Sequence, residues 1–210
     1  MNPSKLPSKD PSMLPSMNPS VLPSMNPSKL PSLNPSKVPS IENTIFSFTG
    51  PQQVDTFDGN VLATLISPPT DFTLFFTLIS LNSEPIDEFG ELIRLQESGT
   101  TCCHFDNFLI GIWFMKSKEH QLVFALSDNT DVIYIWQDLE VGLYVETVVM
   151  LRVLAGRVLI YIDGDLEVDQ IISPLTWNYN ADMTIGKPIW STQDAGDGII
   201  SNIALIEEFL

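Results

Sequence analysis

The chain has 210 residues with a formal net charge of −16, and its composition changes abruptly after Ser40. The first 40 residues carry four lysines and one aspartate, so the other 170 hold a net charge of −19. A domain this acidic, with no run of basic residues, lacks the patch that binding to phosphate backbones needs, which argues against nucleic acid as a partner. Its longest apolar stretch, residues 141–162, includes Glu146, Arg152 and Arg157, so we expect no membrane span.

A Pro-Ser pair recurs every fourth residue, ten times, across residues 1–40. Proline at this spacing is incompatible with a helix or a central strand, and the segment has too few apolar residues to offset its chain entropy. We expect a disordered, extended stalk with polyproline II character. Serine beside proline is typical of O-glycosylated stalks, and an unmodified linker is the alternative. The chain shows no secretory signal peptide, so we expect either a cytoplasmic protein or a mature form or fragment.

Residues 41–210 alternate short runs of β-branched and aromatic residues with turn residues, a pattern typical of all-β proteins. Several runs are continuously apolar, which indicates strands that are covered on both faces. We therefore expect one domain, an antiparallel two-sheet jelly-roll β-sandwich, without an amphipathic helix. The expected strands, in chain order, span residues 44–48, 72–81, 91–95, 108–115, 121–126, 132–137, 143–154, 157–162, 167–171, 183–185 and 199–207.

The clearest local signal is the sequence RVLIYIDGDLEV, residues 157–168. Asp163 and Gly164 are residue types that accept the positive φ angles of a tight hairpin turn between two apolar runs. The first of these runs also follows residues 143–154 across Ala155-Gly156. The sequence therefore predicts three successive antiparallel strands.

The segments DFTLFFTLISL, QLVFALSD, VLIYIDGDLE, MTIGKPIW and GIISNIALIEEF follow one another along the chain. In this order they resemble the successive signatures of laminin G-like domains in the concanavalin A-like lectin/glucanase group. The resemblance covers about residues 44–210 and rests on Tyr161-Ile162-Asp163-Gly164, Ile185-Gly186 and the strand from Gly198 to Ile203. It implies a β-sandwich fold, and the diversity of the family's functions leaves the activity open.

The Pro-Ser repeats of residues 1–40 resemble those of algal surface and wall proteins, those of diatoms in particular. This compositional resemblance implies a location outside the cell or in the cell wall. It covers the stalk alone.

Enzymes of the same group are laminarinase-like glycosidases, and the resemblance implies that such an enzyme would carry Glu-x-Asp-x-(x)-Glu on one strand, with its two catalytic carboxylates about 5–5.5 Å apart. This sequence departs from that pattern. The segment EPIDEFGE scatters Glu84, Asp87, Glu88 and Glu91 over both strand faces. The segment DGDLEVD has the spacing, but Asp163 belongs to the expected turn. We therefore expect no hydrolase activity.

Many laminin G-like domains bind one Ca²⁺ at a rim, so the resemblance implies a candidate calcium site. Its oxygen ligands would come from Asp128 and Asp131, with Asn129 between them, or from Asp194 and Asp197. Ordinary polar turns are the alternative interpretation of both segments.

The chain's two cysteines, Cys102 and Cys103, are followed directly by His104. Consecutive ligands cannot converge on one tetrahedral ion without backbone strain, so a metal site is not expected here. Free thiols in a loop are expected, with a vicinal disulfide as the alternative.

Aromatic residues in polar loops are the candidates for recognition, because sugars stack their apolar C–H faces on aromatic rings. Trp113 and Trp136 lie within expected strands and are interpreted as core. The candidate ligand-binding residues are Trp177, Tyr179, Asn180, Trp190, Asp194 and Asp197. They flank the expected strand 183–185, so the two groups meet only if the loop 187–197 folds over a sheet face. The alternative is that the aromatic residues form lids on the sandwich edge.

The sequence thus predicts a non-catalytic extracellular binding module, with a Pro-Ser stalk at residues 1–40 and a sandwich at residues 41–210. Its partner would be a glycan or a cell-surface or wall protein. A structural or protein-interaction module without a sugar site is the alternative, and a glycoside hydrolase is less favoured.

Overall fold

In the computed structural model the described residues are 43–54, 61–81, 89–99, 108–115, 121–127, 131–186 and 197–208, without the side chains of Phe89, Trp136, Gln137 and Asp138. The Pro-Ser segment, the cysteine pair and most of the loop 187–197 lie outside them. Within the described residues, no helix has the length and apolar character that crossing a membrane requires.

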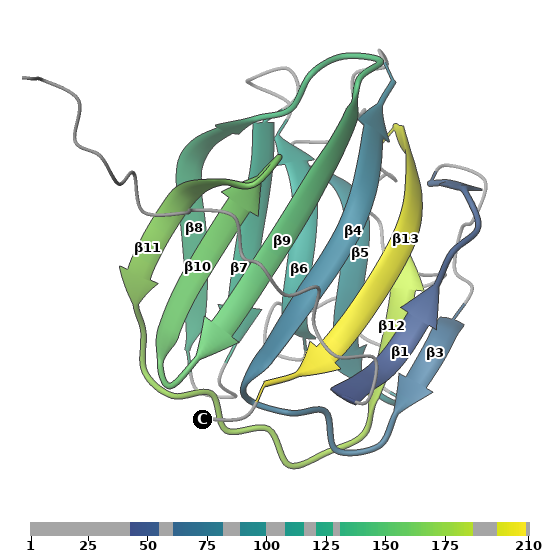
Figure 1. Ribbon diagram of the computed structural model, residues 1–210. Coiled ribbons are helices and arrows are strands. Elements are labelled where there is room, and N and C mark those ends of the chain that lie inside the picture. The colour runs from purple at the N-terminus through teal and green to yellow at the C-terminus, as the bar shows by residue number, and fades with distance from the viewer. Residues whose placement is uncertain are drawn as a thin grey trace, which may run out of the picture. The chain divides into compact units, whose positions relative to one another are not determined.

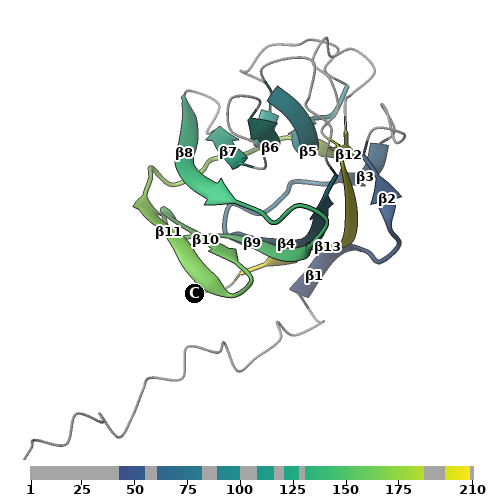
Figure 2. The same cartoon turned by 90° about the horizontal axis from the view of Figure 1, so that it is seen from above.

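Two antiparallel sheets face each other, as Figures 1 and 2 show. The seven-stranded sheet has the order β1 (Thr44–Phe48), β13 (Gly198–Glu207), β4 (Phe72–Ser80), β9 (Glu146–Leu154), β10 (Arg157–Ile162) and β11 (Asp165–Ile171), with β2 (Gln52–Gln53) beside β13. The six-stranded sheet has the order β3 (Val61–Leu65), β12 (Ala181–Ile185), β5 (Phe89–Glu97), β6 (Phe108–Met115), β7 (Gln121–Ser127) and β8 (Val132–Glu140). The expected all-β sandwich is confirmed.

The main core lies between the two sheets. On β4, Phe72, Leu74, Phe76 and Leu78 are all fully buried in it, and the residues between them point to the other face. Alternate residues of a strand point to opposite faces, so one strand supplies both the core and an outer surface. The outer surfaces of both sheets are therefore built from the residues that the core does not use.

Two hairpin turns join β9, β10 and β11. Ala155 and Gly156 have φ angles of 50° and 74°, and Asp163 and Gly164 have φ angles of 52° and 91°. Two successive residues with positive φ are the signature of the type I′ turn, whose twist matches that of the strands it joins. The three-strand meander expected from the sequence is confirmed.

The connection from β11 to β12 closes one edge of the sandwich. Residues 172–180 run along this closing edge, at the bottom of Figure 1, and place Ile172, Leu175 and Trp177 in the main core. The Trp177 Nε1–H donates to the carbonyl oxygen of Ser127 at 2.6 Å, and its ring lies 5.5 Å from that of Phe72. Trp177 therefore acts as an apolar lid on this edge.

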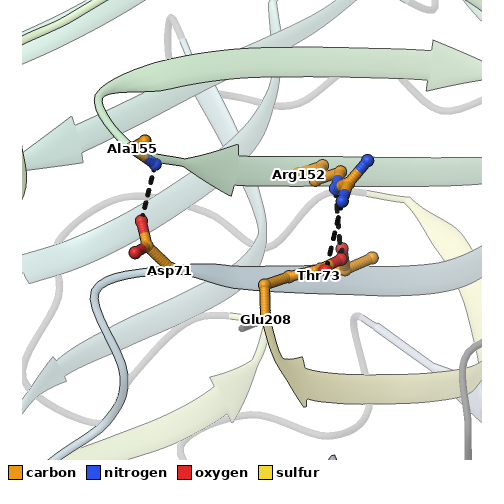
Figure 3. Close-up of polar contacts among 5 residues, drawn as sticks. All are labelled: Asp71, Thr73, Arg152, Ala155 and Glu208. Carbon is orange, nitrogen blue, oxygen red and sulfur yellow. Dashed lines mark hydrogen bonds and ion pairs between the residues drawn. The ribbon is translucent and has the colours of Figure 1, made fainter. Parts of the chain in front are cut away.

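A polar clasp holds the end of β13 beside β4 and β9, as Figure 3 shows. The Glu208 carboxylate accepts a 2.5 Å hydrogen bond from the Thr73 hydroxyl and forms an ion pair of 3.1 Å with Arg152. Beside it, Asp71 accepts a hydrogen bond of 2.8 Å from the backbone N–H of Ala155. The clasp fixes the last strand of the domain to two central strands.

Sequence patterns did not predict β2 or β3. The β3 strand is a short edge strand in which Val61 remains 52% exposed, so the inward and outward alternation that marks a half-buried strand is weak there. Elsewhere the differences are at strand ends. For example, β11 begins at Asp165, directly after the turn, and not at residue 167.

Candidate functional site

The structure places three of the sequence-predicted rim residues at the closing edge. Trp177 is only 8% exposed and belongs to the core. Tyr179 is partly buried, and burial together with the nearby Glu97 raises its pKa to about 12. Asn180 is exposed, and its carbonyl oxygen accepts a hydrogen bond of 2.8 Å from the N–H of Ser98. Of these three predicted rim residues, Tyr179 and Asn180 therefore offer side chains to a ligand at this edge.

Asp197 lies at the opposite edge, where β4 ends and β13 begins. Its carbonyl oxygen accepts a hydrogen bond of 3.0 Å from the N–H of Leu81, directly after β4. The structure therefore does not bring Asp197 to Tyr179 and Asn180. The other predicted members, Trp190 and Asp194, lie outside the described residues.

The predicted calcium ligands are divided in the same way. Asp131 is exposed at the start of β8, Asp197 lies at the opposite edge, and Asp128 and Asp194 are outside the described residues. Over the part of the chain that the structure describes, no group of three or more His, Cys, Asp or Glu side chains comes together.

Two carboxylates of the β10–β11 hairpin, Asp163 and Asp169, have structural partners. Asp163 accepts a hydrogen bond of 2.7 Å from the N–H of Val148, which fixes the turn. Asp169 accepts two hydrogen bonds from Arg157, at 2.6 and 2.5 Å, and this bidentate pair holds the pKa of Asp169 below its usual value. The expected location of Asp163 in the turn is confirmed.

A second buried cluster covers the outer face of the six-stranded sheet. The pairing of neighbouring strands brings its residues together. Thr184 of β12 is paired with Arg94 of β5, and Arg94 is paired with Gly111 of β6. Glu91 of β5 is paired with Trp113 of β6. We call Glu91, Arg94, Phe108, Trp113 and Thr184 the outer-face cluster. All five residues are at most 6% exposed.

A bulge in β5 brings Glu91 and Arg94 onto one face. Strict alternation would place residues three apart on opposite faces, but the register of β5 against β6 shifts between Glu91 and Ile93. Leu92 and Ile93 therefore both point into the main core. This bulge is the reason why the spacing of charged residues in the sequence did not reveal the pair.

Trp113 forms the floor of the cluster. Its indole ring lies over Gly111, where an added Cβ would meet the ring at 1.9 Å. The Phe108 ring contacts it edge-on, with centroids 5.6 Å apart and planes at 84°, and the Arg94 guanidinium lies 5.9 Å from the Phe108 centroid. The interpretation of Trp113 as a buried residue is confirmed, but it is buried on the outer face of its sheet.

Several buried polar atoms of the cluster lack partners. Glu91 Oε1 pairs with Arg94 Nε, while Glu91 Oε2, Trp113 Nε1 and Thr184 Oγ1 have no hydrogen-bond partner within the described residues. Burial raises the pKa of Glu91, and the adjacent Arg94 opposes that shift. Unpartnered groups are rare in protein interiors, so three on neighbouring strands indicate a place for a polar occupant.

No protein-family model matches the sequence, and no curated protein sequence matches it. Among solved structures, the chain is similar to a leech intramolecular trans-sialidase, with a TM-score of 0.58 and 14% identity over 80% of this chain and 26% of that one. The receptor-binding domain of botulinum neurotoxin D matches with a TM-score of 0.51 and 13% identity over 80% of this chain and 50% of that one. The corresponding domain of the mosaic serotype C/D matches with a TM-score of 0.51 and 10% identity, covering 48% of its length.

The fold is an antiparallel two-sheet β-sandwich that these solved structures share. The chain spans about a quarter of the leech enzyme and about half of the toxin domain, and at these identities the likeness concerns the fold alone. In this sandwich, the outer-face cluster occupies the middle of the six-stranded sheet, where the adjacent strands β12, β5 and β6 supply its side chains.

Together the outer-face cluster combines an aromatic floor with complementary polar groups. The indole N–H donates, the free carboxylate oxygen accepts, and the Thr184 hydroxyl can do either. The cluster is nearly neutral because Arg94 balances Glu91. Such a set suits an uncharged ligand with several hydroxyl groups.

Proposed function

We propose that residues 41–210 form a non-catalytic recognition module that binds carbohydrate, and that the outer-face cluster is its contact site. The observation that supports this proposal is the group of three unpartnered buried polar atoms, from Glu91, Trp113 and Thr184, beside an aromatic ring on a β-sandwich face. The resemblance to laminin G-like domains agrees with a binding role.

A sugar has the two properties that this site requires. Its C–H face packs on an aromatic ring such as Trp113, and each hydroxyl group both donates and accepts hydrogen bonds. A buried polar group without a partner costs about 1–3 kcal/mol, so each hydroxyl that pairs with Glu91, Trp113 or Thr184 would recover part of that free energy.

The site is enclosed, and this sets the expected kinetics. Because the residues of the cluster are at most 6% exposed, a sugar can enter only after a rearrangement. Association that requires such a rearrangement is slower than ordinary docking, so we expect a rate constant below about 10⁵ M⁻¹s⁻¹.

In this proposal the Pro-Ser segment is a stalk and the protein acts outside the cell, at a surface or wall. A glycan carried by a wall polymer or a surface protein would be the natural ligand. Calcium stays a candidate, with Asp128 and Asp131 or Asp194 and Asp197 as its ligands, and the loop 187–197 stays a predicted contact surface.

The experiment measures the affinity of the wild type and of three variants for neutral mono- and oligosaccharides by calorimetric titration. Trp113→Phe removes the unpartnered N–H, and Thr184→Val removes the unpartnered hydroxyl without changing the side-chain shape. We expect each to weaken binding at least tenfold, while the matched control Trp177→Phe, a core residue at the closing edge, leaves the affinity unchanged.

Stability measurements separate this function from a structural role. Replacing an unpartnered buried hydroxyl by a methyl group should leave the domain as stable as before or more stable, so Thr184→Val should lose binding without losing stability. If no neutral sugar binds the wild type, or if Trp113→Phe and Trp177→Phe weaken binding equally, the proposal is wrong and the structural-module alternative gains support.

A further inference from the structure

The outer face of the seven-stranded sheet carries a continuous apolar row across five strands. Register places Ala204 of β13 opposite Phe75 of β4, Phe75 opposite Met150 of β9, Met150 opposite Tyr161 of β10, and Tyr161 opposite Leu166 of β11. We call these five residues the apolar row.

The row points away from the main core. Its neighbours along the strands, such as Leu74, Leu151 and Ile160, are fully buried between the sheets. Leu166 is 50% exposed, and the other four residues of the row are partly exposed. A contiguous apolar strip on a domain surface marks an interaction site more often than isolated apolar residues do.

The charges around the row are negative. The two arginines on this face are both neutralised, Arg152 by Glu208 and Arg157 by Asp169. Glu146 and Asp163, at the end of the sheet where β9 begins, have no basic residue of this face beside them in the register. Residues 41–210 carry a net charge of −19, so the domain as a whole attracts cations, and no free cation of this face opposes that attraction among the strands of this sheet that the structure describes.

The geometry of the row suits a helix. Five adjacent strands at about 4.8 Å spacing give a strip of roughly 19 Å, which a helix of about 13 residues would match. Apolar sheet faces are commonly covered by packed helices, and the described part of this chain contains no α-helix that could cover this one.

We infer that the outer face of the seven-stranded sheet docks a cationic amphipathic helix of a partner protein, with its apolar side on the apolar row and its lysines or arginines toward the acidic rim formed by Glu146 and Asp163. A second copy of this chain fits poorly. A symmetric pair would bring together two faces with the same negative rim, and like charges across an interface are unfavourable.

The test uses fluorescence anisotropy with a labelled 14-residue helical peptide that carries leucine on one side and lysine on the other. We expect it to bind the wild-type chain, and a peptide with glutamate in place of lysine to bind at least tenfold more weakly. Met150→Lys and Leu166→Lys should each weaken binding of the lysine peptide at least tenfold. The control Ile66→Lys alters an apolar residue that is 81% exposed and lies outside the apolar row, so it should change affinity less than twofold.

Other results would overturn the inference. Equal weakening by Ile66→Lys and Leu166→Lys would mean nonspecific attraction to an acidic protein, and equal binding of the two peptides would mean unselective hydrophobic contact. Sedimentation that shows a dimer, lost in Leu166→Lys, would assign the face to a second copy. Leu166 is half exposed on an edge strand, so its substitution should leave the fold intact and keep the test decisive.

Discussion

The Trp113 indole ring fills the space in which a side chain at Gly111 would lie. An ideal Cβ on Gly111 would come within 1.9, 2.3 and 2.6 Å of three ring atoms. Glycine inside a strand marks a close approach by another group, and here the group is the aromatic floor of the outer-face cluster. The two residues are therefore one structural unit.

Gly111→Ala should displace the Trp113 ring from its place on β6. Overpacking of this kind costs about 1–3 kcal/mol of unfolding free energy, which urea denaturation would measure. Sugar binding at the outer-face cluster should fall at the same time. Gly50→Ala is the control, because a Cβ there would meet its nearest neighbour at 3.4 Å, an ordinary contact distance. Equal stability of the two variants would contradict this account of Gly111.

Gly164→Val should destabilise the domain through the backbone alone. Gly164 has a φ of 91°, and an added Cβ would meet nothing within 4 Å, so no steric clash contributes. A β-branched residue in this conformation costs roughly 1–2 kcal/mol. Gly164→Asn, a residue that tolerates positive φ, should cost less in the same urea experiment. Sugar affinity should remain unchanged in both variants, and a selective loss of binding would show that the turn has another role.

Glu91 should make stability fall with rising pH over part of the acid range. Its pKa is raised in the folded state above the ordinary value of 4.5, so its favourable contribution is complete below about pH 4.5 and is lost as pH rises through the folded-state pKa. The free energy of unfolding of the wild type minus that of Glu91→Gln should therefore decrease from pH 4 upward. All other titrating groups are shared by the two proteins. A difference that grows with pH would mean that Arg94 outweighs burial.

The clasp at the end of β13 should show energetic coupling between Thr73 and Glu208. Thr73→Val removes the donor and Glu208→Ala removes the acceptor of the 2.5 Å hydrogen bond. In a double-mutant cycle measured by urea unfolding, we expect a coupling energy of about 0.5–1.5 kcal/mol. As a comparison, Thr73→Val combined with Gly164→Asn, at the opposite edge of the sheet, should give additive effects. Additivity in the first cycle as well would mean that the clasp does not stabilise the domain.

The sequence predicted the β10–β11 hairpin well, because Asp163 and Gly164 determine the turn through their own backbone preferences. The site was harder to predict because it depends on register. Trp113 lies in the run FLIGIWFM, which is apolar at every position, so composition alone cannot tell which residues face the core. The Glu91–Arg94 pair depends on a β-bulge that no local sequence pattern predicted. Trp177 lies in a loop by its sequence context, yet its side chain packs into the main core.

The pairing of the first and last strands has a mechanical consequence. β1 begins at Thr44 opposite Ile206, close to the end of β13, so the two ends of the domain leave from the same place. Tension between these ends would pull on the first β1–β13 pair and break the hydrogen bonds one after another, whereas force along the strands would load all of them together. Pulling should therefore peel off β1 at low force. β5, β6 and β12, which hold the outer-face cluster in the other sheet, would carry none of that load.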